Sequence, residues 1–337
     1  MTDRMKGLKS AGAASELIFA CFFVLGRLQP ALYAILIFAF SMIVFPYYEG
    51  GDQEHYRGFY DAVSGMPLSE AYDYYASALG SREPVYFFLV YGFSPYLEKD
   101  FLFSLINALL AFVVVSWVVS NRVIFYIVPL VVFNFYALVL FFPAERLKLA
   151  VLLFMIGCFW RGWVRYFFWG GAIFSHTQTI LLVLSAQSRR VISLFVSLMR
   201  GKVDGGGAFL VLIAVLLCVF VFFMRGHIFD KLEFYMEFGG VGAVIKPLIL
   251  SGLTAYCASG RRLESLISSL PLVVVSFFVG DERIVIFSYF VFLYFALNRN
   301  RGANIPVVLT GGYFLVKGVF FLIGIIEYGD GFAELVF

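Results

Sequence analysis

Long apolar runs separated by short polar stretches are the main pattern along this chain. The runs at 31–44 and 208–224, for example, contain no charged residue. A helix that crosses the hydrocarbon core needs about 20 predominantly apolar residues. A spanning barrel strand would instead alternate apolar and polar residues. The unbroken runs therefore predict an all-α polytopic integral membrane protein, in which helices satisfy their own backbone groups within lipid.

The same pattern predicts roughly 10–12 transmembrane or re-entrant helices. The expected segments are 30–48, 84–97, 101–119, 123–142, 147–160, 166–186, 208–224, 243–258, 264–280, 284–298 and 305–326. Several are too short for a perpendicular crossing, and 84–97 and 166–186 are candidates for re-entrant segments. The segments 11–28 and 189–200 are candidates for helices that lie at the membrane interface.

Composition supports the membrane assignment. Hydrophobic residues make up 62% of the 337 residues and charged residues only 14%, whereas a soluble domain is about half apolar and a quarter charged. The net charge of +3 does not indicate a nucleic-acid partner, and none is expected. The cysteines lie in or beside apolar runs without metal-like spacing, and the histidines are far apart. We therefore predict neither a metal site nor another cofactor.

The distribution of charge predicts a partial topology, because basic loops stay in the cytoplasm. Basic clusters at 189–202, 261–262 and 299–301 mark cytoplasmic loops, and the basic segment 1–29 is expected to be cytoplasmic or interfacial. The stretch 49–83 has seven acidic residues and two arginines, so we expect it to be one extracytoplasmic loop. The rule leaves the side of Arg146 open. A single membrane domain over 1–337 is the simplest organisation.

The polar loop is rich in tyrosine, and two interpretations are open. Tyrosine favours membrane interfaces, where its ring is buried and its hydroxyl is hydrated. Aromatic rings also stack on the apolar faces of sugars, whose hydroxyls suit carboxylates and arginine. If this part of the loop is helical, Asp52, Tyr56 and Tyr60 fall on one face through their four-residue spacing. A carbohydrate site is the functional interpretation.

Further candidate residues interrupt the apolar runs, where ionisable groups are costly. Arg82 and Glu83 precede Pro84, so they either begin a helix or contact a polar ligand. Arg146 either extends to the interface from a helix end or binds substrate. His176 is expected inside an apolar segment among polar neighbours, where imidazole can act as a base.

A last interruption, 281–283, contains Glu282 and Arg283. It is either a tight outer turn or part of a buried polar site. Arginine at such a position suits phosphate oxygens through its planar set of donors.

The order of these motifs resembles a known family. A Gly50–Gly51–Asp52 turn with Tyr56 comes first, followed by the Glu83–Pro84 dipeptide, Arg146 and His176. This order resembles the EpsG-like family of polysaccharide biosynthesis proteins, which belongs with the Wzy-type O-antigen and capsule polymerases. The resemblance covers roughly residues 30–300. Two departures are Leu147, where the family often has glutamine after the arginine, and the basic N-terminal extension.

The resemblance implies a glycosyl polymerase in the bacterial inner membrane, with its N-terminus in the cytoplasm and its active site facing the periplasm. It would transfer one oligosaccharide repeat, linked to undecaprenyl pyrophosphate, onto the sugar of another, without a metal. His176 or Asp52 would be the base and Arg146 would stabilise the leaving group. The implied substrate-binding residues are Arg82, Glu83, Tyr56, Tyr60, Glu282 and Arg283. Membrane lipids and a chain-length regulator are the other expected partners.

Two alternatives belong to other classes. One is a different enzyme of lipid-linked sugars, such as a ligase or another polyprenyl-dependent glycosyltransferase. The other is a flippase or transporter of lipid-linked saccharides, for which internal repeats or a charged central cavity would be expected. Neither feature is visible in the sequence.

Overall fold

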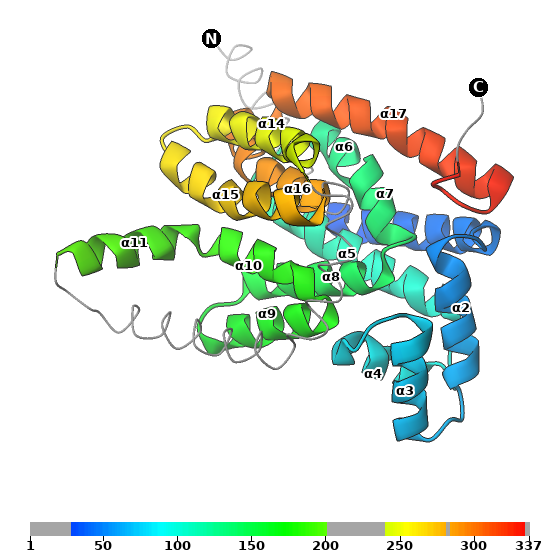
Figure 1. The fold of residues 1–337 in the computed structure, drawn as a ribbon. Coiled ribbons are helices and arrows are strands. Elements are labelled where there is room, and N and C mark those ends of the chain that lie inside the picture. Colours follow the sequence, from blue (N-terminus) through cyan, green and yellow to red (C-terminus); the bar gives the residue numbers. More distant parts are fainter. Residues whose placement is uncertain (1–27, 201–239, 281–283, 334–337) are drawn as a thin grey trace, which may run out of the picture. The chain divides into compact units, whose positions relative to one another are not determined.

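The computed structural model describes residues 28–200, 240–280 and 284–333, and every regular element in these ranges is a helix (Figure 1). The prediction of an all-α chain is therefore confirmed for the described residues. Most of segment 1–29, the expected helix at 208–224, and both Glu282 and Arg283 lie outside them.

Four of the described helices are long and apolar enough to cross a membrane. They are Leu28–Tyr47, Lys99–Ser120, Arg262–Val279 and Arg299–Tyr328. Shorter apolar helices are Pro84–Phe93, Thr177–Ala186, Val241–Cys257 and Ile284–Ala296. These helices support membrane association, while the larger number of crossings stays a prediction.

The chain divides into two compact units, residues 1–177 with 311–337 and residues 178–310. The first unit begins with the helix Leu28–Tyr47, whose last turn is η1 (Phe45–Tyr47). It continues through α2 (Asp52–Val63), α3 (Leu68–Ala78), α4 (Pro84–Phe93), α5 (Lys99–Ser120), η2 (Phe125–Ile127), α6 (Val128–Val132), α7 (Phe135–Phe141), α8 (Glu145–Phe159) and α9 (Trp163–Ser175). Most of α17 (Ile305–Tyr328) also belongs to it.

The second unit contains α10 (Ile180–Ala186), α11 (Ser188–Met199), α14 (Val241–Cys257), α15 (Arg262–Val279), α16 (Ile284–Ala296) and η4 (Arg299–Gly302). Buried serines line the faces that meet. Ser268 Oγ donates to the Ser185 carbonyl at 3.1 Å, and the Ser251 and Ser269 hydroxyls lie 2.8 Å apart. Small polar residues of this kind let apolar helices approach closely.

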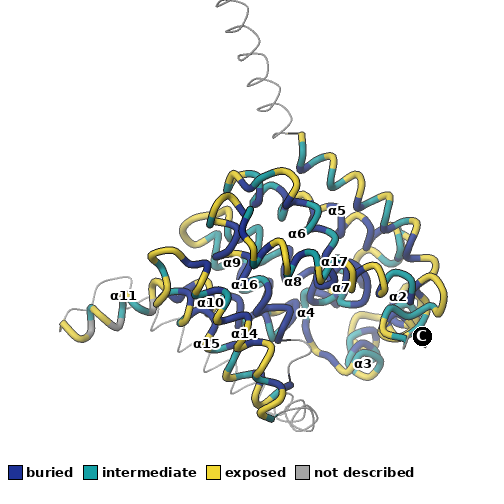
Figure 2. The backbone as a smooth tube through the Cα atoms, turned by 90° about the horizontal axis from the view of Figure 1, so that it is seen from above, coloured by how far each residue is buried: buried dark blue, intermediate teal, exposed yellow. Residues whose placement is uncertain are grey.

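Helix α8 lies at the centre of the first unit and packs against α9, α5 and α7. Buried positions dominate α7 and the first half of α8 (Figure 2). The close approach of α8 and α9 depends on Gly157, because a Cβ there would lie 2.6 Å from the Trp169 ring. The C-terminal half of α8 is thereby held close to α9.

Two segments that we predicted as single apolar runs, one of them a candidate re-entrant segment, are interrupted. The segment 123–142 breaks at Asn134, whose side chain accepts a hydrogen bond from Ala137 N and donates to the Val131 carbonyl at 2.6 Å. The segment 166–186 breaks at His176, which ends α9 with extended backbone angles (φ −157°, ψ 111°). Breaks in apolar helices are tolerated where side chains satisfy the released backbone groups. Hydropathy alone does not reveal them.

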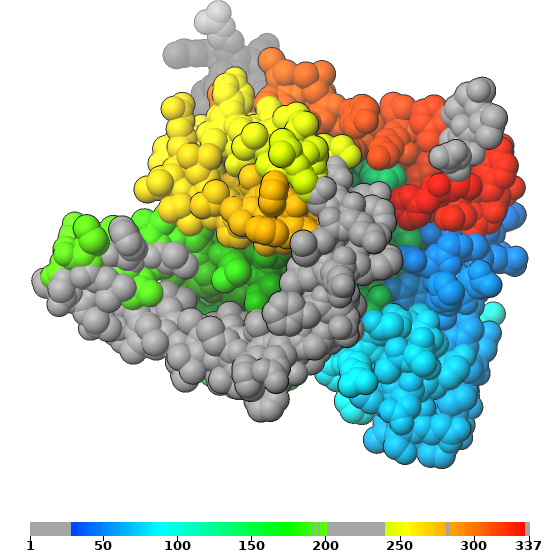
Figure 3. Space-filling view, in the orientation of Figure 1, coloured from blue at the N-terminus to red at the C-terminus, as the bar shows by residue number. Residues whose placement is uncertain are grey.

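The expected polar loop 49–83 is largely helical. It forms α2 and α3, which pack on each other and on α4 and make one continuous blue-to-cyan surface in Figure 3. Gln53, Tyr56, Tyr60 and Val63 are buried along α2, at the three- and four-residue spacing of an amphipathic helix. The segment is helical from Asp52, so the four-residue spacing puts Asp52 on the same side of α2 as Tyr56 and Tyr60, but Asp52 is exposed whereas the two tyrosines are buried.

Candidate functional site

The first turn of α8 directs two consecutive ionisable side chains into two polar clusters. Pro143 precedes the helix, and Glu145 and Arg146 are its first two residues. A carboxylate at this end of a helix is favoured by the helix dipole. Glu145 and Arg146 lie too close in sequence to share one face of the helix, so each joins a different cluster.

The Glu83 cluster consists of Glu83, Arg146, His176, Thr177, Ser81, Tyr56 and Tyr75. Arg146 Nη1 donates to Glu83 Oε2 at 3.0 Å, and His176 Nδ1 lies 3.2 Å from Glu83 Oε1. The Thr177 backbone N–H donates to the same Oε1 at 3.0 Å. One carboxylate therefore joins a guanidinium and an imidazole that lie far apart in sequence.

Local breaks in helices bring these groups together. Pro84 starts α4, so Glu83 precedes the helix in an extended conformation, and its side chain is available for tertiary contacts. His176 ends α9, which releases the Thr177 N–H from helical bonding and lets it donate to Glu83. Contacts of α9 with both α8 and α4 support this arrangement.

The cluster is mostly buried but not closed. The exposed fractions of the side chains are 3% for Glu83, 15% for Arg146 and 10% for His176. Burial alone would raise the pKa of the Glu83 carboxyl, but His176, Arg146 and the Thr177 N–H together hold it well below its ordinary value. Glu83 is therefore a fixed negative charge that orients two groups with access to solvent.

Tyrosines line the cluster on the side of α2, α3 and α4. Arg146 Nε donates to the Tyr56 hydroxyl at 3.2 Å, and the Tyr75 hydroxyl donates to Ser81 Oγ at 3.2 Å. Ser81 Oγ in turn donates to Glu83 Oε2 at 2.9 Å. The Tyr56 and Tyr86 rings lie 5.8 Å apart. This aromatic wall is the part of the tyrosine-rich segment that approaches the charged groups.

The Glu145 cluster, made of Glu145, Lys99, Gln53, Tyr86 and Lys148, was not predicted as a unit. Glu145 Oε1 accepts from Lys99 Nζ at 2.6 Å and from Gln53 Nε2 at 3.0 Å, and Oε2 accepts from Tyr86 at 2.7 Å. Lys148 Nζ donates to the Phe141 carbonyl at 2.7 Å. All five residues are buried. The sequence signal was weak, since Gln53 and Lys99 lie at helix starts, where polar residues are common.

The remaining predicted residues lie elsewhere in the described structure. Arg82 is exposed, and its carbonyl accepts from Tyr72. Tyr60 is buried and donates to the Leu97 carbonyl at 2.7 Å. Asp52 is exposed at the start of α2, and Glu282 and Arg283 lie outside the described residues. The structure thus joins Glu83, Arg146, His176 and Tyr56 directly and does not join Asp52 or Arg82 to them through a side chain.

No group of three or more histidine, cysteine, aspartate or glutamate side chains has a metal-binding arrangement within the described ranges. Comparison with protein-family models, with curated proteins and with solved structures gave no match in any of the three.

Proposed function

We propose that this protein is a membrane-embedded glycosyl polymerase, which transfers an undecaprenyl-pyrophosphate-linked oligosaccharide repeat onto a sugar of another lipid-linked repeat. The carrying observation is that Glu83 binds Arg146 and approaches His176 through the same carboxylate. The cluster thus combines a phosphate-binding group and a proton acceptor beside an aromatic wall. The motif order of the EpsG-like family supports the same assignment.

His176 is the proposed general base. A carboxylate beside Nδ1 favours the tautomer that has its proton on Nδ1, which makes Nε2 the proton acceptor. In the proposed step the acceptor hydroxyl loses its proton to His176 while its oxygen bonds to the anomeric carbon of the donor. The bond between that carbon and the pyrophosphate oxygen breaks, and undecaprenyl pyrophosphate leaves with the electron pair. Asp52, the other candidate base, is exposed and outside the cluster.

Arg146 is the proposed ligand of the leaving pyrophosphate. Glu83 and Tyr56 engage Nη1 and Nε, and they thereby fix the plane of the guanidinium before substrate binds. A guanidinium has five N–H donors, so this anchoring leaves others for phosphate oxygens. Such a fixed positive group stabilises charge that develops on the leaving group.

The membrane supplies the route for the substrate in this proposal. The polyprenyl tail partitions into lipid beside the apolar helices, while the pyrophosphate stays at the interface. The active site faces the periplasm of a bacterial inner membrane, and a chain-length regulator is the expected protein partner.

The test uses single substitutions in a strain that lacks the gene, with surface polysaccharide separated by size. We expect Arg146→Ala and His176→Ala each to reduce chain extension about 100-fold or more, and to leave single capped repeats. Arg161→Ala and His55→Ala are the matched controls, since both residues are exposed and outside the cluster. Long chains in both cluster variants would refute the proposal, and complete loss of surface repeats would favour a flippase.

A further inference from the structure

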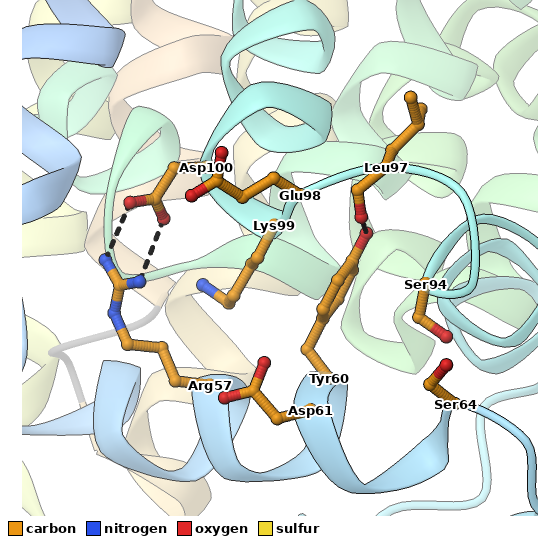
Figure 4. A pocket seen from close by; sticks show the side chains of 9 residues that line it. All are labelled: Arg57, Tyr60, Asp61, Ser64, Ser94, Leu97, Glu98, Lys99 and Asp100. Atoms are coloured by element: carbon orange, nitrogen blue, oxygen red, sulfur yellow. Dashed lines mark hydrogen bonds and ion pairs between the residues drawn. The ribbon is translucent and has the colours of Figure 1, made fainter.

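A second site lies at the junction of α2 with the start of α5. Here the structure forms a pocket of about 480 Å³, lined by Arg57, Tyr60, Asp61, Ser64, Ser94, Leu97, Glu98, Lys99 and Asp100 (Figure 4). All these residues belong to the first unit. None of them except Tyr60 was a predicted site residue, and the proposed reaction does not use them.

Two carboxylates of the pocket are available to a ligand. Asp100 is bound by Arg57 at 3.0 Å, and Lys99 is bound to Glu145 at 2.6 Å, so both pocket cations are already paired. Asp61 and Glu98 are exposed, and neither side chain has an ion pair or hydrogen bond to another described residue. Ionised carboxylates accept hydrogen bonds and donate none, which favours ligands rich in donors and disfavours anions.

The walls add groups suited to a polyol. The Tyr60 hydroxyl donates to the Leu97 carbonyl at 2.7 Å, which fixes its ring along one side of the pocket (Figure 4). Burial, with Glu145 and Asp61 nearby, raises the pKa of Tyr60 to about 12, so the phenol stays neutral. Ser94 Oγ is buried and has no hydrogen-bond partner among the described residues. A buried hydroxyl in that state is costly, so the wall holds an unused hydrogen-bonding group just beneath the surface of the pocket.

The pocket is structurally connected to the proposed reaction site. Lys99 lines the pocket and binds Glu145, which precedes Arg146 in the first turn of α8. Helix α2 contributes Arg57, Tyr60 and Asp61 to the pocket and Tyr56 to the Glu83 cluster. The pocket and the Glu83 cluster therefore share helix α2 and are linked through the buried Lys99–Glu145 pair.

We infer that this pocket is a saccharide subsite of the proposed polymerase, and that it selects sugars bearing hydroxyl or amino donors over sugars bearing carboxylate or phosphate groups. The inference rests on the proposed function for its role in chain growth. The binding preference itself follows from the two unpaired carboxylates and the paired cations that line the pocket.

The test measures binding of three tetrasaccharides to the full chain in phosphatidylcholine nanodiscs by saturation-transfer NMR. The probes are the neutral N-acetylglucosamine tetramer, the cationic glucosamine tetramer and the anionic galacturonate tetramer. We expect the first two to bind and the third not to bind. The double variant Asp61→Asn with Glu98→Gln should weaken the cationic probe about tenfold or more. Glu54→Gln, an exposed change on the same helix, should leave binding unchanged.

Several results would overturn the inference: no binding of any probe, equal binding of all three, or equal loss in the double variant and in Glu54→Gln. The Ser94→Leu variant gives an independent test, because a larger side chain fills the pocket and should abolish binding of the neutral probe. If the wild type binds the probes, the double variant weakens that binding as expected, and polymer growth does not need Arg146 or His176, the subsite stands and the polymerase is refuted. If the wild type does not bind the probes while polymer growth needs both Arg146 and His176, the subsite is refuted and the polymerase stands.

Discussion

Glu145 and Arg146 are neighbours in sequence, yet they belong to clusters with opposite properties. The Glu145 carboxylate is fully buried, and a lysine, a glutamine and a tyrosine donate to it. The Arg146 side chain is 15% exposed, and its anchor Glu83 also engages a histidine. The fully buried, hydrogen-bonded Glu145 cluster stabilises one packing arrangement of the helices. The Glu83 cluster is partly exposed, so its side chains can also bind a ligand. The comparison therefore separates structural from functional charge within one helical turn.

The largest expected effect is on stability, from Glu145→Ala. The substitution leaves Lys99 buried without its ionic partner and should lower the free energy of unfolding by roughly 3–5 kcal/mol. Unfolding of the purified protein in detergent, followed by denaturant titration, measures this change. The double variant Glu145→Met with Lys99→Met should recover part of the loss, because the buried charge of Lys99 is removed together with its partner, while Lys148 keeps only its hydrogen bond to the Phe141 carbonyl. A loss below about 1 kcal/mol for Glu145→Ala would mean that the cluster does not stabilise the fold.

A smaller effect is expected from acid on the open cluster. The pKa of Glu83 is lower in the folded protein than its ordinary value of 4.5, so its ion pairs stabilise the fold fully above that pH. This contribution is lost as the pH falls below 4.5 through the folded pKa, since protonation removes the charge that Arg146 binds. Thermal unfolding between about pH 6 and pH 3 measures it.

The control for this pH dependence is Glu83→Gln, which cannot lose a charge. Its unfolding temperature should be lower than that of the wild type at pH 6 and should change less on acidification. Glu54→Gln, at an exposed position, should retain the wild-type profile. Identical pH profiles in wild type and Glu83→Gln would contradict the assignment of Glu83 as the charged centre of its cluster.

The sequence predicted these two clusters unequally. Ionisable residues in apolar surroundings are conspicuous, so Glu83, Arg146 and His176 could be selected one by one. Their meeting depends on the helix break at His176 and on the extended residue before Pro84, and only the latter has a sequence signal. Gln53 and Lys99 gave only a weak sequence signal, because a helix start is an ordinary place for a polar residue. The helical class followed from hydropathy, whereas the break at Asn134 depends on side-chain hydrogen bonds that hydropathy does not report.

The finest comparison uses two tyrosines that pack 5.8 Å apart and belong to different clusters. Tyr86→Phe removes a donor to the buried Glu145 carboxylate and should cost about 1.5–3 kcal/mol, the usual value for a hydrogen bond to a charged group. Tyr56→Phe removes an acceptor from Arg146, but this guanidinium has Glu83 and some solvent as partners, so the cost should be about 1 kcal/mol or less. Denaturant titration of the two variants side by side gives both values, and chain extension in cells gives the second readout.

We expect Tyr56→Phe to impair extension more than Tyr86→Phe although it destabilises less, because only Tyr56 orients the group that binds the leaving pyrophosphate. If Tyr56→Phe destabilised the protein more than Tyr86→Phe and impaired chain extension less, the Glu83 cluster would be structural. The Glu145 cluster would then be the one to test for a role in the reaction.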